Sequence, residues 1–89
     1  MVGEGKRAVS LIKKALSLAS DNPQVLYLAG AAYEQMGDRD TALHWINEAL
    51  RHGYSLAEIE HEPELSALMA DNRFESLRRQ TKNAYKKEN

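Results

Sequence analysis

The chain has 89 residues and carries 12 lysines and arginines against 13 aspartates and glutamates, for a formal net charge of −1. This length allows one small domain that buries roughly 60–65% of its unfolded surface. The absence of cysteine excludes disulfides and thiolate metal sites, and no apolar run approaches the roughly 20 residues of a membrane span.

The first predicted helix runs from about Lys6 to Ala19. Its apolar residues follow the i, i+3, i+4 spacing that lines one helical face. After it, Asn22 is a natural N-cap and Pro23 suits the first position of a second helix. The stripe consists of Val9, Ile12, Ala15, Leu16 and Ala19.

The second predicted helix, about 23–36, has Gly30 in its middle, which costs roughly 1 kcal/mol relative to alanine. Such a cost is tolerated where a neighbouring helix comes close, so Gly30 predicts a helix crossing. Gly37 can take the left-handed conformation that closes a helix. A third helix, about 39–51, then ends before Gly53, which makes an antiparallel helical hairpin.

One pattern occurs twice along these helices, with a period of 34 residues. A fixed period of this size is typical of a solenoid of helical hairpins, in which each unit buries one face against its neighbour. It favours a binding scaffold over an enzyme. The six pairs are Gly3 and Gly37, Ala8 and Ala42, Val9 and Leu43, Ile12 and Ile46, Ala15 and Ala49, and Leu16 and Leu50.

Two strings carry a family resemblance: Leu26-x2-Ala29-Gly30-x2-Tyr33, then Ala42-x3-Ile46-x2-Ala49. They resemble the tetratricopeptide repeat pattern W-x2-L-G-x2-Y…A-x3-F…A, with apolar substitutes for Trp, Leu and Phe. The closing Pro of the pattern has no counterpart. The resemblance covers about 1–55 and implies an all-α, right-handed solenoid, with 1–22 as the second half of a truncated repeat and 23–55 as a complete repeat.

The period fails beyond Ser55, where Pro63 interrupts what would be a helix. Short helices are expected at about 56–60 and from Pro63 or 64 to 70. A last helix starts near Asn72, which forms a capping-box variant with Glu75. A divergent terminal unit is also what a repeat stack needs, because its outer face must be polar.

Residues 54–77 are similar to the closing element of bacterial tetratricopeptide arrays, "DP-x-L-x2-L…D-P-R-F-x2-L". The matching strings are Glu62-Pro63-x-Leu65-x2-Leu68 and Asp71-Asn72-Arg73-Phe74-x2-Leu77. The resemblance implies that 56–89 form a C-terminal helical cap with a basic tail. In the proteins that it resembles, this ending often follows a kinase, a cyclase or a winged-helix regulator domain.

The sequence contains no residue pattern typical of a catalytic site. The string His61-Glu62-Pro63-Glu64 lacks the second histidine of a zinc-protease helix, and the surrounding glutamates are expected to form a solvated acidic rim. The basic tail has no motif for reading nucleic acid, so partners of that class and membranes are not expected. The sequence predicts no catalytic residue, no metal and no cofactor. The tail residues are Arg78, Arg79, Lys82, Lys86 and Lys87.

The resemblance places a binding groove on the second helix, on the side away from its hairpin partner, for a peptide or helix of a partner protein. Two alternatives stay open. Tyr27 and Leu28 pack on the first helix instead, or the chain is a structural cap that self-associates through an exposed face of its first helix. A cytoplasmic location is expected. The groove residues are Gln24, Tyr27, Leu28, Ala31, Glu34 and Gln35.

Overall fold

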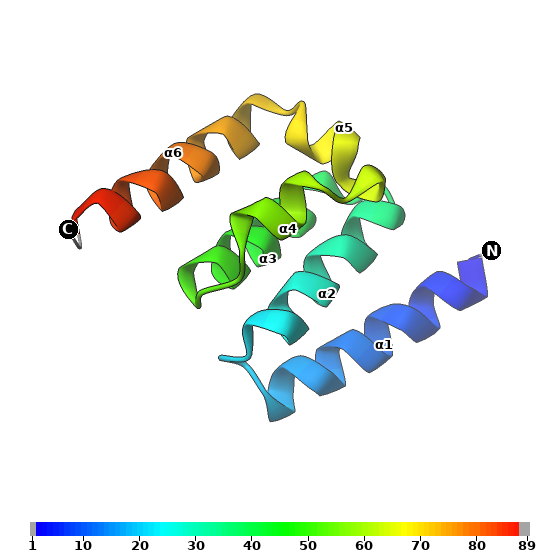
Figure 1. Ribbon diagram of the computed structural model, residues 1–89. Helices are drawn as coiled ribbons and strands as arrows, with labels where there is room; N and C mark the ends of the chain where they lie inside the picture. The colour runs from blue at the N-terminus through cyan, green and yellow to red at the C-terminus, as the bar shows by residue number, and fades with distance from the viewer. Residues whose placement is uncertain (1, 88–89) are drawn as a thin grey trace.

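The computed structural model describes residues 2–87, and that part of the chain is all-helical, without a strand (Figure 1). Three long helices come first, short elements follow, and another long helix ends the chain. The elements are α1 (Val2–Leu18), α2 (Pro23–Gln35), α3 (Arg39–Arg51), α4 (Leu56–Glu60), the 3-10 turn η1 (Pro63–Leu65), α5 (Ser66–Met69) and α6 (Asn72–Lys87).

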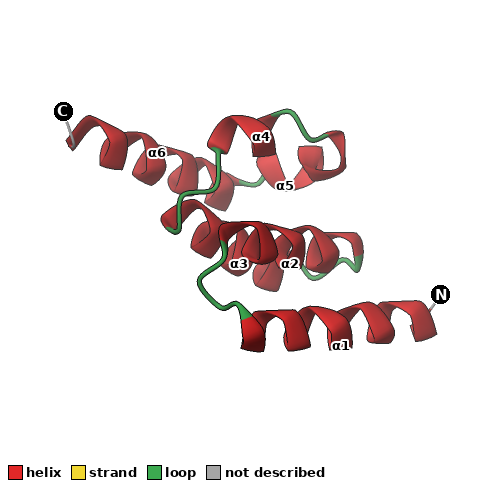
Figure 2. Cartoon of the chain, turned by 60° about the horizontal axis from the view of Figure 1, so that its bottom comes forward, coloured by secondary structure: helices red, strands yellow, loops and turns green. Residues whose placement is uncertain are grey.

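The helices are arranged in three layers (Figure 2). Helix α1 forms one outer layer, the α2–α3 hairpin lies in the middle, and α4, α5 and α6 form the other outer layer. The start of α1 and the end of α6 lie at opposite sides of the molecule. The hairpin is therefore covered on both sides, by α1 and by the C-terminal elements.

The α2–α3 crossing occurs at Gly30, which confirms the predicted close approach. A Cβ atom at this position would lie 2.6 Å from Ile46 Cδ1 and 3.2 Å from the Ala42 carbonyl oxygen. Gly37 and Gly53 both have positive φ, 85° and 98°, at the ends of α2 and α3. Glycine adopts this left-handed conformation at low cost, which explains why each helix ends there.

Two hydrophobic clusters fill the layers. The smaller one joins α1, α2 and α3 through Leu16, Leu26, Ala29 and Ala49. The larger one joins the hairpin to the C-terminal elements. Tyr27 and Tyr54 pack against both clusters and so connect them. The larger cluster consists of Ala42, Leu43, Ile46, Leu50, Leu56, Ile59, Leu65, Leu68 and Phe74.

The bounds of two helical stretches and one capping residue differ from the sequence-based expectation. Helix α1 begins at Val2 rather than at 6, since the glycines there lower helix propensity without ending a helix. The stretch after Pro63 is split into η1 and the single turn α5. The capping interaction before α6 is made by Asp71 rather than Asn72, because Asp71 Oδ1 accepts the Arg73 backbone N–H at 2.9 Å.

Helix α1 has a second apolar stripe beside the predicted one. Leu16 of the predicted stripe is buried, and Ile12 packs against the same cluster. Leu11 and Leu18 instead remain 64% and 80% exposed. Within the described residues, no helix combines the length and the apolar character that crossing a membrane requires.

Candidate functional site

The six predicted groove residues divide into two groups. Gln24, Leu28 and Gln35 are exposed, with Leu28 at 51%. The other three take part in contacts within the chain: Tyr27 and Ala31 pack against the larger hydrophobic cluster, and the Glu34 side chain is only 9% exposed. The opposite face of α2 buries Leu26, Ala29 and Gly30.

Helix α2 therefore presents a strip, which we call the α2 strip, made of the exposed Gln24, Leu28 and Gln35 and the partly buried Ala31. These residues follow one another at intervals of four, three and four, so they share one helical face. Gln35 Nε2 donates to Glu64 Oε2 of η1 at 2.9 Å. This bond places η1 beside the C-terminal end of the strip.

Tyr54 borders the strip through a stacked aromatic pair. Its ring centroid lies 4.4 Å from that of Tyr27, and the two planes differ by 5°. Burial raises the pKa of Tyr27, and the nearby Tyr54, Glu62, Glu64 and Glu58 raise it further. Both tyrosines are half-buried. Because Tyr27 is next to Leu28 on α2, the two stacked rings form one side of the strip, which we call its wall.

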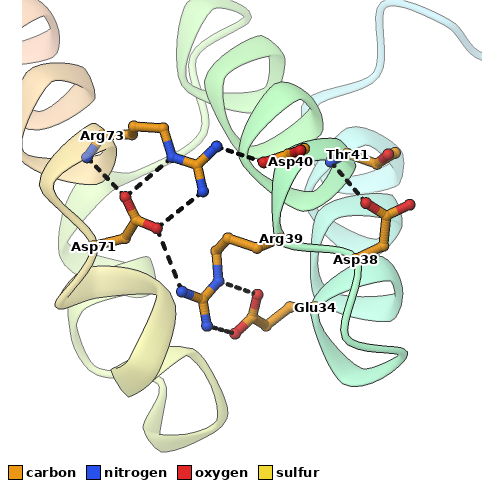
Figure 3. A network of polar contacts seen from close by, with 7 residues as sticks. All are labelled: Glu34, Asp38, Arg39, Asp40, Thr41, Asp71 and Arg73. Carbon is orange, nitrogen blue, oxygen red and sulfur yellow. Dashed lines mark hydrogen bonds and ion pairs between the residues drawn. The ribbon is translucent and has the colours of Figure 1, made fainter.

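Glu34 is used inside the fold. Arg39 donates from Nε and Nη2 to the two Glu34 carboxylate oxygens, at 2.7 Å each (Figure 3). Arg39 Nη1 lies 3.4 Å from Asp71 Oδ2, and Arg73 bridges Asp71 to Asp40. This polar network ties the α2–α3 turn to the start of α6.

Asp71 lies at the centre of the network. Its carboxylate accepts from the Arg73 side chain at 3.1 and 3.0 Å and from the Arg73 backbone N–H. Those hydrogen bonds hold the pKa of Asp71 far below its usual range. The same bonds, together with the one to Asp40, raise the pKa of Arg73. The network therefore stabilises the charged forms of its members.

Residues 54–72 contain five carboxylates and no lysine or arginine. Some of these carboxylates form ion pairs within the fold and the others do not. Glu60 Oε2 lies 3.0 Å from Arg78 Nε, and Asp71 belongs to the network above. Among the described residues, no ion pair joins Glu58, Glu62 or Glu64 to a cationic side chain. Three of the five carboxylates are therefore left beside α2 with no cationic partner in that part of the chain.

His61 follows directly after α4 as its C-cap and is exposed. Its Nδ1 lies 2.7 Å from the Ala57 carbonyl oxygen. With Ala57 and Glu58 it lines an open hollow of about 270 Å³. No group of three or more His, Asp or Glu side chains able to hold a metal ion occurs in the part of the chain that the structure describes.

The basic C-terminal segment is partly neutralised within the fold. Arg78 pairs with Glu60 and with Glu75, and its guanidinium carbon lies 5.2 Å from the centre of the Phe74 ring. Arg79 lies 3.7 Å from Glu75. The side chains of residues 85–87, which complete the predicted basic tail, lie outside the described residues.

One curated protein, DnaJ homolog subfamily C member 3 of the mouse Mus musculus, is similar to part of this chain. The two are 37% identical over 49 residues, which are 55% of this chain and 10% of the mouse protein. The chain therefore spans far less than the length of that relative. No family model matches the chain, and no solved structure matches it.

Sequence reasoning did not identify Tyr54, Arg39 or Asp71 as partners of the α2 residues. One signal was present for Tyr54, because it stands where the repeat pattern has its closing Pro. The Arg39–Asp71 pair joins residues 32 positions apart. No periodicity in the sequence indicates a contact of that kind.

Proposed function

We propose that the chain is a non-catalytic protein–protein interaction module of the tetratricopeptide type, which binds a peptide or helix of a partner protein along the α2 strip. The exposed strip itself carries the proposal: Leu28 is 51% exposed on a helix whose opposite face is buried against α3. The hairpin with its glycine crossing and the partial likeness to the mouse DnaJ homologue support it. In this proposal 1–22, 23–55 and 56–89 are a half repeat, a full repeat and a cap in a protein of the cytoplasm.

Selection of peptides from a displayed random library against the immobilised chain tests this function. Selected peptides are expected to lose binding to Leu28→Ser, because the strip loses its exposed apolar side chain. Leu18→Ser is the matched control, since it makes the same change at a leucine that is 80% exposed on α1. A library that yields no binder contradicts the function. Binders that tolerate Leu28→Ser contradict the assignment of the surface.

A second candidate function is self-association or structural capping, and α1 favours it. Leu11 and Leu18 expose an apolar stripe on the outer layer of the fold. In this case the wild type sediments as a dimer and Leu11→Ser/Leu18→Ser as a monomer, whereas Leu28→Ser stays dimeric. A wild type that remains monomeric across the concentration range contradicts it.

A further inference from the structure

The surface around the α2 strip combines an exposed apolar side chain with carboxylates that form no ion pair with any described residue. Leu28 lies at the middle of the strip. The stacked Tyr27 and Tyr54 form its wall, and Glu64 reaches it through the hydrogen bond to Gln35. Apolar and charged groups are thus presented together on one side of the molecule.

The segment that packs beside α2 carries only negative charge. Residues 54–72 contain five carboxylates and no lysine or arginine. Arginines from α6 and from the network neutralise Glu60 and Asp71. Glu58 and Glu64 are exposed and Glu62 is half-buried. Glu64 is hydrogen-bonded to Gln35 of α2, Glu62 directly precedes η1, which packs on α2, and Glu58 is next to Ile59, whose cluster contacts Tyr27. Within this segment, the carboxylates that have no cationic partner among the described residues therefore lie beside α2.

We propose that the α2 strip, with Glu58, Glu62 and Glu64, is a docking surface for a basic amphipathic segment of a partner protein. Such a segment carries lysines or arginines next to an apolar side chain. The apolar side chain packs on Leu28, and the cations meet the three carboxylates. The inference rests on the proposed function and specifies the chemical class of the partner. Complementary charge of this kind mainly sets specificity and the rate of encounter, so binding weakens as salt is added.

Fluorescence anisotropy with two labelled peptides tests the proposal. One is a 14-residue peptide with lysines and leucines at helical spacing, and the other has glutamate in place of each lysine. The lysine peptide is expected to bind at least about tenfold more tightly, and its affinity to fall between 50 and 300 mM salt. Glu58→Gln/Glu62→Gln is expected to weaken its binding about three- to tenfold, as the loss of two surface ion pairs implies.

A matched double variant controls for net charge. Asp21→Asn/Glu48→Gln makes the same change in charge, with Asp21 in the α1–α2 connection and Glu48 on α3. It is expected to bind the lysine peptide as the wild type does. Thermal unfolding followed by circular dichroism verifies that both double variants fold.

Three results would overturn the inference. The first is equal affinity for the glutamate peptide. The second is equal weakening by the control variant, which indicates nonspecific attraction. The third is a wild-type dimer that the lysine peptide dissociates. In that case the occupant is α1 of a second copy, which contains four basic residues against one glutamate. Library peptides that need Leu28 but lack basic residues contradict this inference and leave the proposed function standing.

Discussion

Gly30→Ala tests whether α2 and α3 approach as closely as the structure indicates. Alanine favours a helix over glycine by about 1 kcal/mol, so at an open helical position the substitution stabilises. Here the added Cβ would lie 2.6 Å from Ile46 Cδ1, 2.7 Å from Ile46 Cγ1 and 3.2 Å from the Ala42 carbonyl oxygen. The two effects have opposite signs, so the measured sign decides between them.

The structure favours destabilisation. Ile46 is 0% exposed and packs within the larger cluster, so its side chain moves only at the expense of its neighbours, and the Ala42 carbonyl belongs to the backbone of α3. Overpacking of this kind costs about 1–3 kcal/mol. After the gain in helix propensity, we expect a net loss of about 1 kcal/mol, or a fall of about 5 °C in Tm for a domain of this size.

A double-mutant cycle with Ile46→Val identifies the cause. Valine lacks the Cδ1 atom that the new methyl group meets, so the double variant should be more stable than the sum of the single changes by at least about 0.5 kcal/mol. Urea unfolding followed by circular dichroism measures all four proteins. A stabilised Gly30→Ala variant, or a cycle without coupling, would refute the close approach.

Three further changes are expected to act on the rest of the fold. Gly53→Ala should destabilise by about 1–2 kcal/mol through its φ of 98° alone, since a Cβ there meets nothing within 4 Å; thermal unfolding measures the loss, and an unchanged Tm contradicts it. Tyr54→Ala should cost about 2 kcal/mol by removing the stacked ring, whereas Tyr54→Phe should cost little at pH 7. Burial raises the pKa of Tyr54 above its usual 10.0, so stability present below pH 10 is lost at higher pH, and Tyr54→Phe should flatten that alkaline decline. The pKa of Asp71 is lowered rather than raised, so pH acts in the opposite direction. The stability that ionised Asp71 contributes is present above about pH 4 and is lost as the pH falls further. The free energy of unfolding of Asp71→Asn should therefore approach that of the wild type in acid.

Local features of the sequence predicted α1 and most of the hairpin. The stripe of α1, the crossing at Gly30 and the turn at Gly37 each follow from spacing or from backbone freedom, which are local properties. α2 and α3 lie within one residue of their expected bounds. The short α4 was also predicted, because Pro63 and the polar residues around it limit any helix there.

The contacts of the candidate site depend on residues far apart in the chain. Glu34 was predicted to face a partner, but Arg39 satisfies both of its oxygens. No contact between Tyr54 and α2 was predicted, yet the Tyr54 ring stacks on Tyr27. Spacing along one helix reveals which residues share a face. It does not reveal which residue from another element covers that face.

The C-terminal elements therefore shape the candidate binding surface as well as closing the fold. Apolar residues such as Ile59 and Leu65 cover the hydrophobic side of the hairpin. The C-terminal elements also contribute Glu64 to the edge of the α2 strip, and Tyr54, in the connection that leads from α3 into α4, stacks on Tyr27 beside it. The Arg39–Asp71 pair holds them in register with α2, since it joins the α2–α3 turn to the start of α6. Weakening that pair should consequently alter binding along α2 even though neither residue lies on the strip.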